Sequence, residues 1–254
     1  MPLLKNLVVI GQGAPNQLRD GRQSRCVCAY SLDNKILIRL YPFPIYMLRK
    51  WDIFDEDVEE NPSDHRENTW KVKNSKEDWN RIFKWVTLKG KYPENKQEEL
   101  IKYIGFSTLS DIRDHKRSFG IILPIIRDFK LEQQNESTIK QMTLGGMEDL
   151  DEPFTIINQK DYKYKPYIAY ECIGNCTCKD KVHCQSITEW GCFEFMRKNS
   201  GKEMNLKDNL QLFNDEYNKY ILVGNIYKAP QTYVVIDILR FKNKKMPVGK
   251  NEDI

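Results

Sequence analysis

Apolar residues alternate with polar ones along much of this chain, in short runs that are rich in β-branched and aromatic side chains. Runs of this kind, bounded by Gly, Pro or Asn, are typical of β-strands. They predict a strand at 5–11, a hairpin over 25–44, a short strand at 69–73, a strand broken at Pro124 within 118–134, a strand at 164–174 and two strands within 219–241.

A spacing of three and four residues between apolar positions predicts helices in four other segments. The first begins at Ser75, a favourable N-cap residue, and extends to 88. The others are 95–106, which is closed by a glycine, then 186–201 and 206–217. The predicted fold class is therefore α+β, with a β-rich N-terminal part containing two helices and a C-terminal part of the order β-α-α-β-β.

The polar segment around 136–153 has a glycine pair and an acidic run, which are features of a linker. We expect it to separate an N-terminal β-rich domain, residues 1–135, from a C-terminal α+β domain, residues 154–245. No internal repeat is evident in the sequence.

The composition indicates a folded protein without a membrane partner. Forty per cent of the residues are hydrophobic, and the formal net charge is +4. No run approaches the roughly 18 apolar residues that a membrane-spanning helix needs, and the N-terminus lacks the pattern of a signal peptide. We expect a cytoplasmic protein whose cysteines are reduced.

Charge is unevenly distributed along the chain. Residues 1–50 contain eight Lys or Arg against two Asp, whereas 51–70 contain eight acidic residues against one Arg. The first segment predicts a basic face and the second an acidic loop, although both patterns also fit ordinary solvated surfaces. The residues that we expect to contact phosphates are Arg19, Arg22, Arg25, Arg240, Lys242, Lys244 and Lys245.

The segment 172–184 concentrates four cysteines and a histidine within thirteen positions. Thiolates and imidazoles in two close pairs are the usual ligands of structural zinc. The predicted ligands are Cys172, Cys176 and Cys178, with His183 or Cys184 as the fourth. Buried packing of the cysteines, or a reactive thiol activated by neighbouring lysines, would also fit the composition.

The same region contains candidates for acid–base or metal-assisted catalysis, namely His183, Glu189 and Glu194. An amphipathic helix with inward-facing apolar residues and solvated charges explains the two glutamates equally well. The chain has no zinc-protease, Walker, nucleophile-elbow or deaminase motif. The sequence thus leaves catalysis open and favours a protein without it.

Two parts of the chain resemble an uncharacterised prokaryotic family. The N-terminal part has an R-x-Y-P strand motif, "RLYP", followed by "WDIFD" and "DHRENTWK". The C-terminal part has a Cys/His knuckle before a helix beginning Glu189-Trp190, where an Asp is usual, and then a "VGN" hairpin. Because genes for restriction or defence functions neighbour this family, the resemblance implies a role connected with nucleic acid, and it marks His183, Glu189 and Trp190 as positions of interest.

Together these features predict a nucleic-acid-binding or adaptor protein of a prokaryotic defence or mobile-element system, containing zinc. Two alternatives remain. One is a metal-dependent hydrolase or nuclease subunit, and the other is a protein-interaction subunit whose acidic segment 52–67 docks a basic partner.

Overall fold

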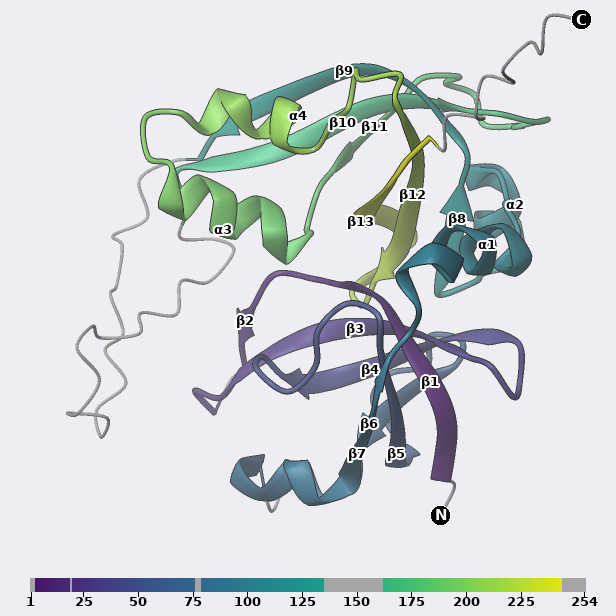
Figure 1. The fold of residues 1–254 in the computed structure, drawn as a ribbon, viewed down its shortest axis with the longest axis vertical. Helices are drawn as coiled ribbons and strands as arrows, with labels where there is room; N and C mark the ends of the chain where they lie inside the picture. Colours follow the sequence, from purple (N-terminus) through teal and green to yellow (C-terminus); the bar gives the residue numbers. More distant parts are fainter. Residues whose placement is uncertain (1–2, 19, 76–78, 135–161, 244–254) are drawn as a thin grey trace, which may run out of the picture.

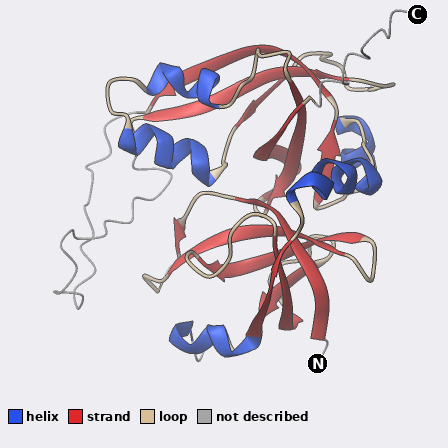
Figure 2. Ribbon diagram, in the orientation of Figure 1, coloured by secondary structure: helices blue, strands red, loops and turns tan. Residues whose placement is uncertain are grey.

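Strands dominate the structure, a computed structural model that describes residues 3–18, 20–75, 79–134 and 162–243. In the N-terminal part the elements are β1 Leu3–Gln12, β2 Asn16–Gln17, β3 Gln23–Ser31, β4 Ile36–Pro44, β5 Asp52–Glu60, β6 Thr69–Val72, a 3-10 helix Trp79–Trp85, β7 Val86–Lys91, α1 Glu94–Ile104 and α2 Leu109–Asp114. They are followed by β8 Phe119–Ile122, β9 Pro124–Gln133, β10 Tyr164–Cys172, β11 His183–Ser186, α3 Trp190–Lys198, a 3-10 helix Glu203–Asn205, α4 Leu206–Asn209, β12 Tyr217–Ile226 and β13 Ala229–Lys242. The expected α+β class is confirmed (Figure 2).

Five strands, β1, β3, β4, β5 and β6, close into a barrel, which we call the first barrel (lower half of Figure 1). Its order is β1-β3-β4-β6-β5, and β5 pairs back with β1. The pairing of β4 with β6 is parallel and the others are antiparallel. After the 3-10 helix, β7 also pairs with β5, along the part of β5 that precedes its pairing with β6. In chain order the strands are therefore arranged 1-2-3-5-4-1, which is the arrangement of an OB-fold barrel, a five-stranded Greek-key barrel.

The later strands repeat this arrangement in a second barrel. β8 and β9 together make its first strand, because β8 pairs with β12 and β9 pairs with β10. β10 then pairs with β11, and β12 pairs with β13. A parallel bridge between Ile187 and Val235 brings the end of β11 to β13. The order is again 1-2-3-5-4-1, with α3 and α4 inserted between the third and fourth strands, so the fold contains a repeat that the sequence does not reveal.

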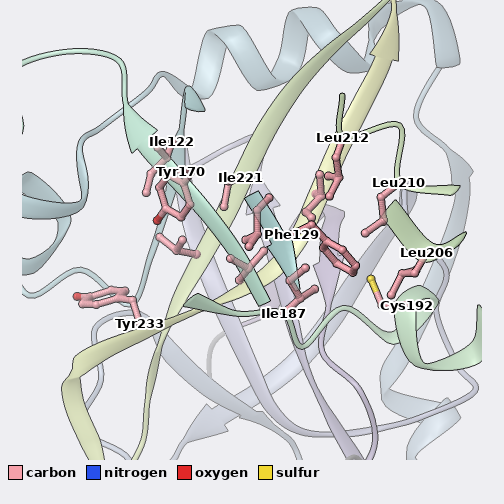
Figure 3. Packing of buried hydrophobic residues seen from close by; sticks show 14 of the residues in the cluster. Ile122, Phe129, Tyr170, Ile187, Cys192, Leu206, Leu210, Leu212, Ile221 and Tyr233 are labelled. Atoms are coloured by element: carbon pink, nitrogen blue, oxygen red, sulfur yellow. The ribbon is translucent and has the colours of Figure 1, made fainter. Parts of the chain in front are cut away.

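Each barrel encloses an apolar core. In the first barrel, Val27, Ala29, Leu40 and Phe54 are completely buried. In the second, residues of the strands pack against those of the two helices (Figure 3). The labelled side chains of that cluster are Ile122, Phe129, Tyr170, Ile187, Cys192, Leu206, Leu210, Leu212, Ile221 and Tyr233.

The expected linker, 136–153, lies outside the described residues. The strands on its two sides, β9 and β10, pair with each other along their length, from Gln133 opposite Tyr164 to Pro124 opposite Cys172. β8 likewise pairs with β12. Segments on either side of residues 136–153 therefore form the same sheets.

Three predictions about local structure are wrong. The helix expected over 206–217 ends at Asn209, and turns follow it up to β12. Residues 79–85 form a 3-10 helix, and Val86–Lys91 is a strand, where we expected one helix through 88. The β-branched pair Val86 and Thr87 favours the strand, and β5 supplies its hydrogen-bonding partner. The acidic segment, expected to be a loop, is largely a strand, because Asp52–Glu60 forms β5 and only the part from 61 to 67 is a loop.

The two barrels contact each other through Arg39, which is 2% exposed. Its guanidinium projects from β4 and donates to the carbonyl of Ser118 at 2.8 Å and to Asn225 Oδ1 at 3.0 Å. It also lies over the Phe119 ring, 4.0 Å from the centroid. A planar group with several donors is suited to this combination of hydrogen bonds and stacking.

An ion pair between a half-buried lysine and a buried aspartate makes a second link between the barrels. Lys50, which precedes β5, donates to Asp237 of β13 at 2.5 Å. Burial and the neighbouring Glu189 raise the pKa of Asp237 to about 7, whereas Lys50 and Arg240 act in the opposite direction. Glu189 and Asp237 thus lie close enough to influence each other, and Lys50 pairs with Asp237.

We predict that Lys50→Met lowers the free energy of unfolding more at pH 8 than at pH 5. Because the pKa of Asp237 is higher in the folded than in the unfolded chain, ionising it already costs stability as the pH rises toward 7. Without Lys50 the pKa of Asp237 rises further, so at pH 8 the additional loss should be up to about 1.4 kcal/mol, the free energy of one pKa unit. Urea denaturation at both pH values measures this, with the exposed Lys91→Met as the control, and an equal loss at the two pH values would contradict it.

Candidate metal centre and nucleic-acid interface

The cysteine-rich segment connects β10 to β11 in the second barrel. Cys172 ends β10, and His183 begins β11, so the strand pairing brings both ends of the segment together. Gly174 permits the tight turn between them, because its φ of +120° is one that side-chain-bearing residues rarely adopt.

Cys172, Cys176 and His183 form a cluster that could hold a metal ion. Their ligand atoms all lie within 4.8 Å of one another. Cys176 Sγ is 3.4 Å from His183 Nε2, and two such ligands on a tetrahedral zinc would be about 3.6 Å apart, given the usual bond lengths. The cluster therefore has the spacing of a metal centre.

Cys178 lies beside this cluster. Its thiol interacts with that of Cys176, and Arg113 of α2 donates toward its sulfur at 3.8 Å. Cys178 is nevertheless not one of the three residues whose ligand atoms all lie within 4.8 Å of one another. Cys184 is not part of the cluster, because neighbouring side chains on a strand point to opposite faces, and it is exposed where His183 is buried.

Hydrogen bonds from α2 and its N-cap region surround the sulfurs. The backbone N–H of Leu109 donates to Cys172 Sγ at 3.4 Å. Burial opposes ionisation of Cys176, yet hydrogen bonds from Cys178, Ser110 and His183 lower its pKa to about 6. Burial raises the pKa of Cys172 to about 12. Donors directed at the sulfurs are the outer contacts that stabilise thiolate ligands.

The predicted catalytic residues each have different partners. His183 belongs to the metal cluster and packs edge-on against Tyr170. Glu189 is 6% exposed and accepts a hydrogen bond from the backbone of Ile238. Glu194 pairs with Arg197 on the surface of α3. The described residues therefore provide no shared acid–base site from these three.

Several predicted phosphate contacts are engaged inside the protein. Arg25 is 1% exposed and donates to Gln12 and to the carbonyl of Leu48, so the expectation that it contacts phosphate is wrong. Arg22 pairs with Asp20, and Arg240 is half-buried beside Asp237. Lys242 is exposed. Arg19, Lys244 and Lys245 lie outside the described residues.

β9, β10 and β11 form one face of the second barrel, on which Lys130 is exposed, Lys165 and Tyr167 are half-buried, and Ser186, opposite Tyr167, is buried. Phe129 and Ile168, which are opposite each other, point into the core, so Lys130 and Tyr167, the next opposing pair, point outward. Lys130 Nζ lies 5.2 Å from the centre of the Tyr167 ring, and Lys165 Nζ lies 5.4 Å from it. Glu132 pairs with Lys130 at 2.6 Å. An aromatic ring with two lysine ammonium groups within 5.4 Å of its centre thus occupies this face.

Sequence reasoning missed this cluster. The signal was present in "YKYKPY", residues 162–167, where tyrosines and lysines alternate at the start of a predicted strand. Because the partner Lys130 is distant in sequence, only the pairing of β9 with β10 brings the basic and aromatic residues together.

Residues 4–102, which include the first barrel and most of α1, match a family described as a domain of unknown function (DUF8758). The match does not reach the cysteine segment or the face of β9, β10 and β11. None of the curated proteins matches the chain. Among the described helices, none is both long and apolar enough to cross a lipid bilayer. By fold and site, the chain is a double-barrel protein with a potential metal centre in its second barrel.

We predict that Cys176→Ser abolishes metal binding, whereas Cys184→Ser leaves about one ion per chain. The reason is that only Cys176 lies in the cluster, although both residues are in the predicted ligand segment. Elemental analysis of each purified variant measures this, and circular dichroism checks that the strands remain. Equal loss of metal in the two variants would contradict the assignment.

Proposed function

We propose that this protein binds single-stranded nucleic acid on the outer face of β9, β10 and β11, and that a zinc ion fixes the loop between two of these strands. The observation that carries the proposal is the ring of Tyr167, which has the ammonium groups of both Lys130 and Lys165 within 5.4 Å of its centre. The family resemblance adds that this binding would serve a prokaryotic defence or mobile-element system.

The position of this cluster on the barrel supports the proposal. OB-fold barrels bind oligonucleotides across their second and third strands, which here are β10 and β11. Since one fold can support many functions, the side chains must carry the argument. An aromatic ring can stack on any base, and lysines beside it can neutralise the phosphates on either side, which is how single strands are bound without sequence preference.

Single strands fit this site better than a duplex does. In a duplex the bases are stacked on each other and paired, so a ring such as Tyr167 cannot reach a base face. A splayed single strand offers both its bases and its phosphates to a shallow sheet. We expect the preference for single strands to be independent of sequence.

Zinc is the ion that suits the cluster. Thiolates and imidazole are the ligands that zinc favours, and three Cys with one His complete a closed, structural site. By joining the end of β10 to the start of β11, the ion would fix the pairing of the two strands that carry the binding face. The elemental analysis described above should identify zinc, and iron or copper in its place would contradict this assignment.

The alternative of a protein-interaction subunit has less support. Its acidic segment is engaged within the chain, because Asp55 pairs with Lys89, Glu59 with Lys71, and Asp64 with Arg66. The alternative of a nuclease lacks a shared site for its three candidate residues.

We predict that Tyr167→Ala weakens binding of a fluorescein-labelled oligothymidylate about 5- to 150-fold, because one stacked base contributes about 1–3 kcal/mol. Fluorescence anisotropy at low salt measures the affinity. Tyr103→Ala is the control, since Tyr103 is an exposed tyrosine of α1 that lies elsewhere on the surface.

We predict that Glu132→Gln strengthens the same binding several-fold. The change removes a negative charge beside Lys130 and frees that lysine for phosphate. Glu99→Gln, on α1, should have no effect. Weaker or unchanged binding by Glu132→Gln would contradict the proposed position of the phosphates.

A further inference from the structure

The two barrels present equivalent surfaces, and only one of them is free. In the first barrel the second and third strands are β3 and β4, which correspond to β10 and β11 in the second barrel. If both surfaces bound nucleic acid, one chain would hold two strands or one long strand.

The surface of the first barrel is covered by the second barrel and α1. Outward-facing residues of β1 and β3 are buried in a cluster that is separate from the barrel's own core. The cluster joins Val8, Ile10, Cys28 and Tyr30 to Leu100, Ile101, Phe119, Ile121, Tyr220, Leu222, Ile236 and Leu239. No base could stack on this part of β3 without separating the barrels.

Arg39 closes the β4 side of the same surface. Its guanidinium would be a natural phosphate ligand if it were exposed. Instead it is buried and its donors are directed at Ser118 and Asn225. Arg66, from the loop after β5, adds a hydrogen bond to the carbonyl of Asn225 at 2.8 Å. The basic residues of this surface are thus used to dock the second barrel.

We propose that one chain binds one short single strand, using the second barrel only, and that the equivalent face of the first barrel is a docking surface within the molecule. This inference rests on the proposed function. Beyond the proposed function, it specifies the number of binding sites, the length of nucleic acid that they bind and the role of the first barrel, whose residues match the family of unknown function.

The dimensions of the free face set the length of strand. Three strands about 4.8 Å apart, of which β10 has nine residues, give a face about 10 Å by 30 Å. The two lysines can contact about two phosphates, and the one aromatic ring can stack on one base. The expected footprint is therefore about 4–8 nucleotides, at the lower end of the range for a single barrel of this kind. The salt dependence should be shallow, with a slope of log K against log salt near about −1.4.

The test is a length series of fluorescein-labelled oligothymidylates, from three to twenty nucleotides, titrated with the full-length protein. We expect affinity to stop rising, apart from a statistical increase, at about 4–8 nucleotides. Calorimetry with an eight-nucleotide strand should give one strand per chain. Tyr167→Ala should weaken binding at every length by a similar factor.

The outcomes separate the two proposals. If no oligonucleotide binds at low salt, the proposed function fails and this inference fails with it. Any one of three results would show that a second surface binds nucleic acid: two strands bound per chain, affinity that keeps rising beyond about 12 nucleotides, or a Tyr167→Ala variant that keeps its affinity for long strands. In that case this inference is overturned while the proposed function stands. Arg81→Ala, a change in the 3-10 helix of the first barrel, is the matched control and should follow the wild type at every length.

Discussion

The two barrels meet around a buried cation, Arg39, beside the apolar cluster that joins them. Arg39 is enclosed by the Phe119 ring, the carbonyl of Ser118 and the amide oxygen of Asn225, so its charge is satisfied by dipoles rather than by water. Burial lowers its pKa, as expected for a desolvated guanidinium. If the second barrel moved away from these contacts, the guanidinium would lose its hydrogen-bonding partners, and leaving a buried charge unpaired costs several kcal/mol. The contact therefore fixes which surface of the first barrel is hidden and, as a result, which surface of the second is free.

The metal centre provides a comparable constraint within the second barrel. The segment that it would close connects the two strands of the free face, and the donors from α2 are already directed at its sulfurs. β11 has only four residues, so its pairing with β10 gains from a link at the end of both strands. The concentration of cysteines would thus serve to link β10 to β11, the strands that carry the proposed binding face.

Much of the local structure could be predicted from the sequence, but the closure of the barrels could not. Alternating apolar residues correctly placed the hairpin of β3 and β4 and the strands around Pro124, because these signals are local. The closing contacts, β1 with β5 and β11 with β13, join distant segments without any local signal. Arg25 shows the same limit, since its charge suggested exposure while its partners, Gln12 and Leu48, lie elsewhere in the chain. The choice between His183 and Cys184 could not be made from the sequence, because no strand was predicted there, and only β11 shows that the two side chains point to opposite faces.

Cys184 offers the most direct test of the account, because it is exposed and lies opposite Ala169 on the proposed binding face. The measurement is the rate at which Cys184 reacts with a maleimide, followed by peptide mass spectrometry, with and without a saturating eight-nucleotide single strand. The account predicts that the strand slows the reaction several-fold, while a cysteine introduced at exposed Lys91 of the first barrel reacts at an unchanged rate. An unchanged rate at Cys184 under saturating strand would mean that nucleic acid does not lie across β9, β10 and β11.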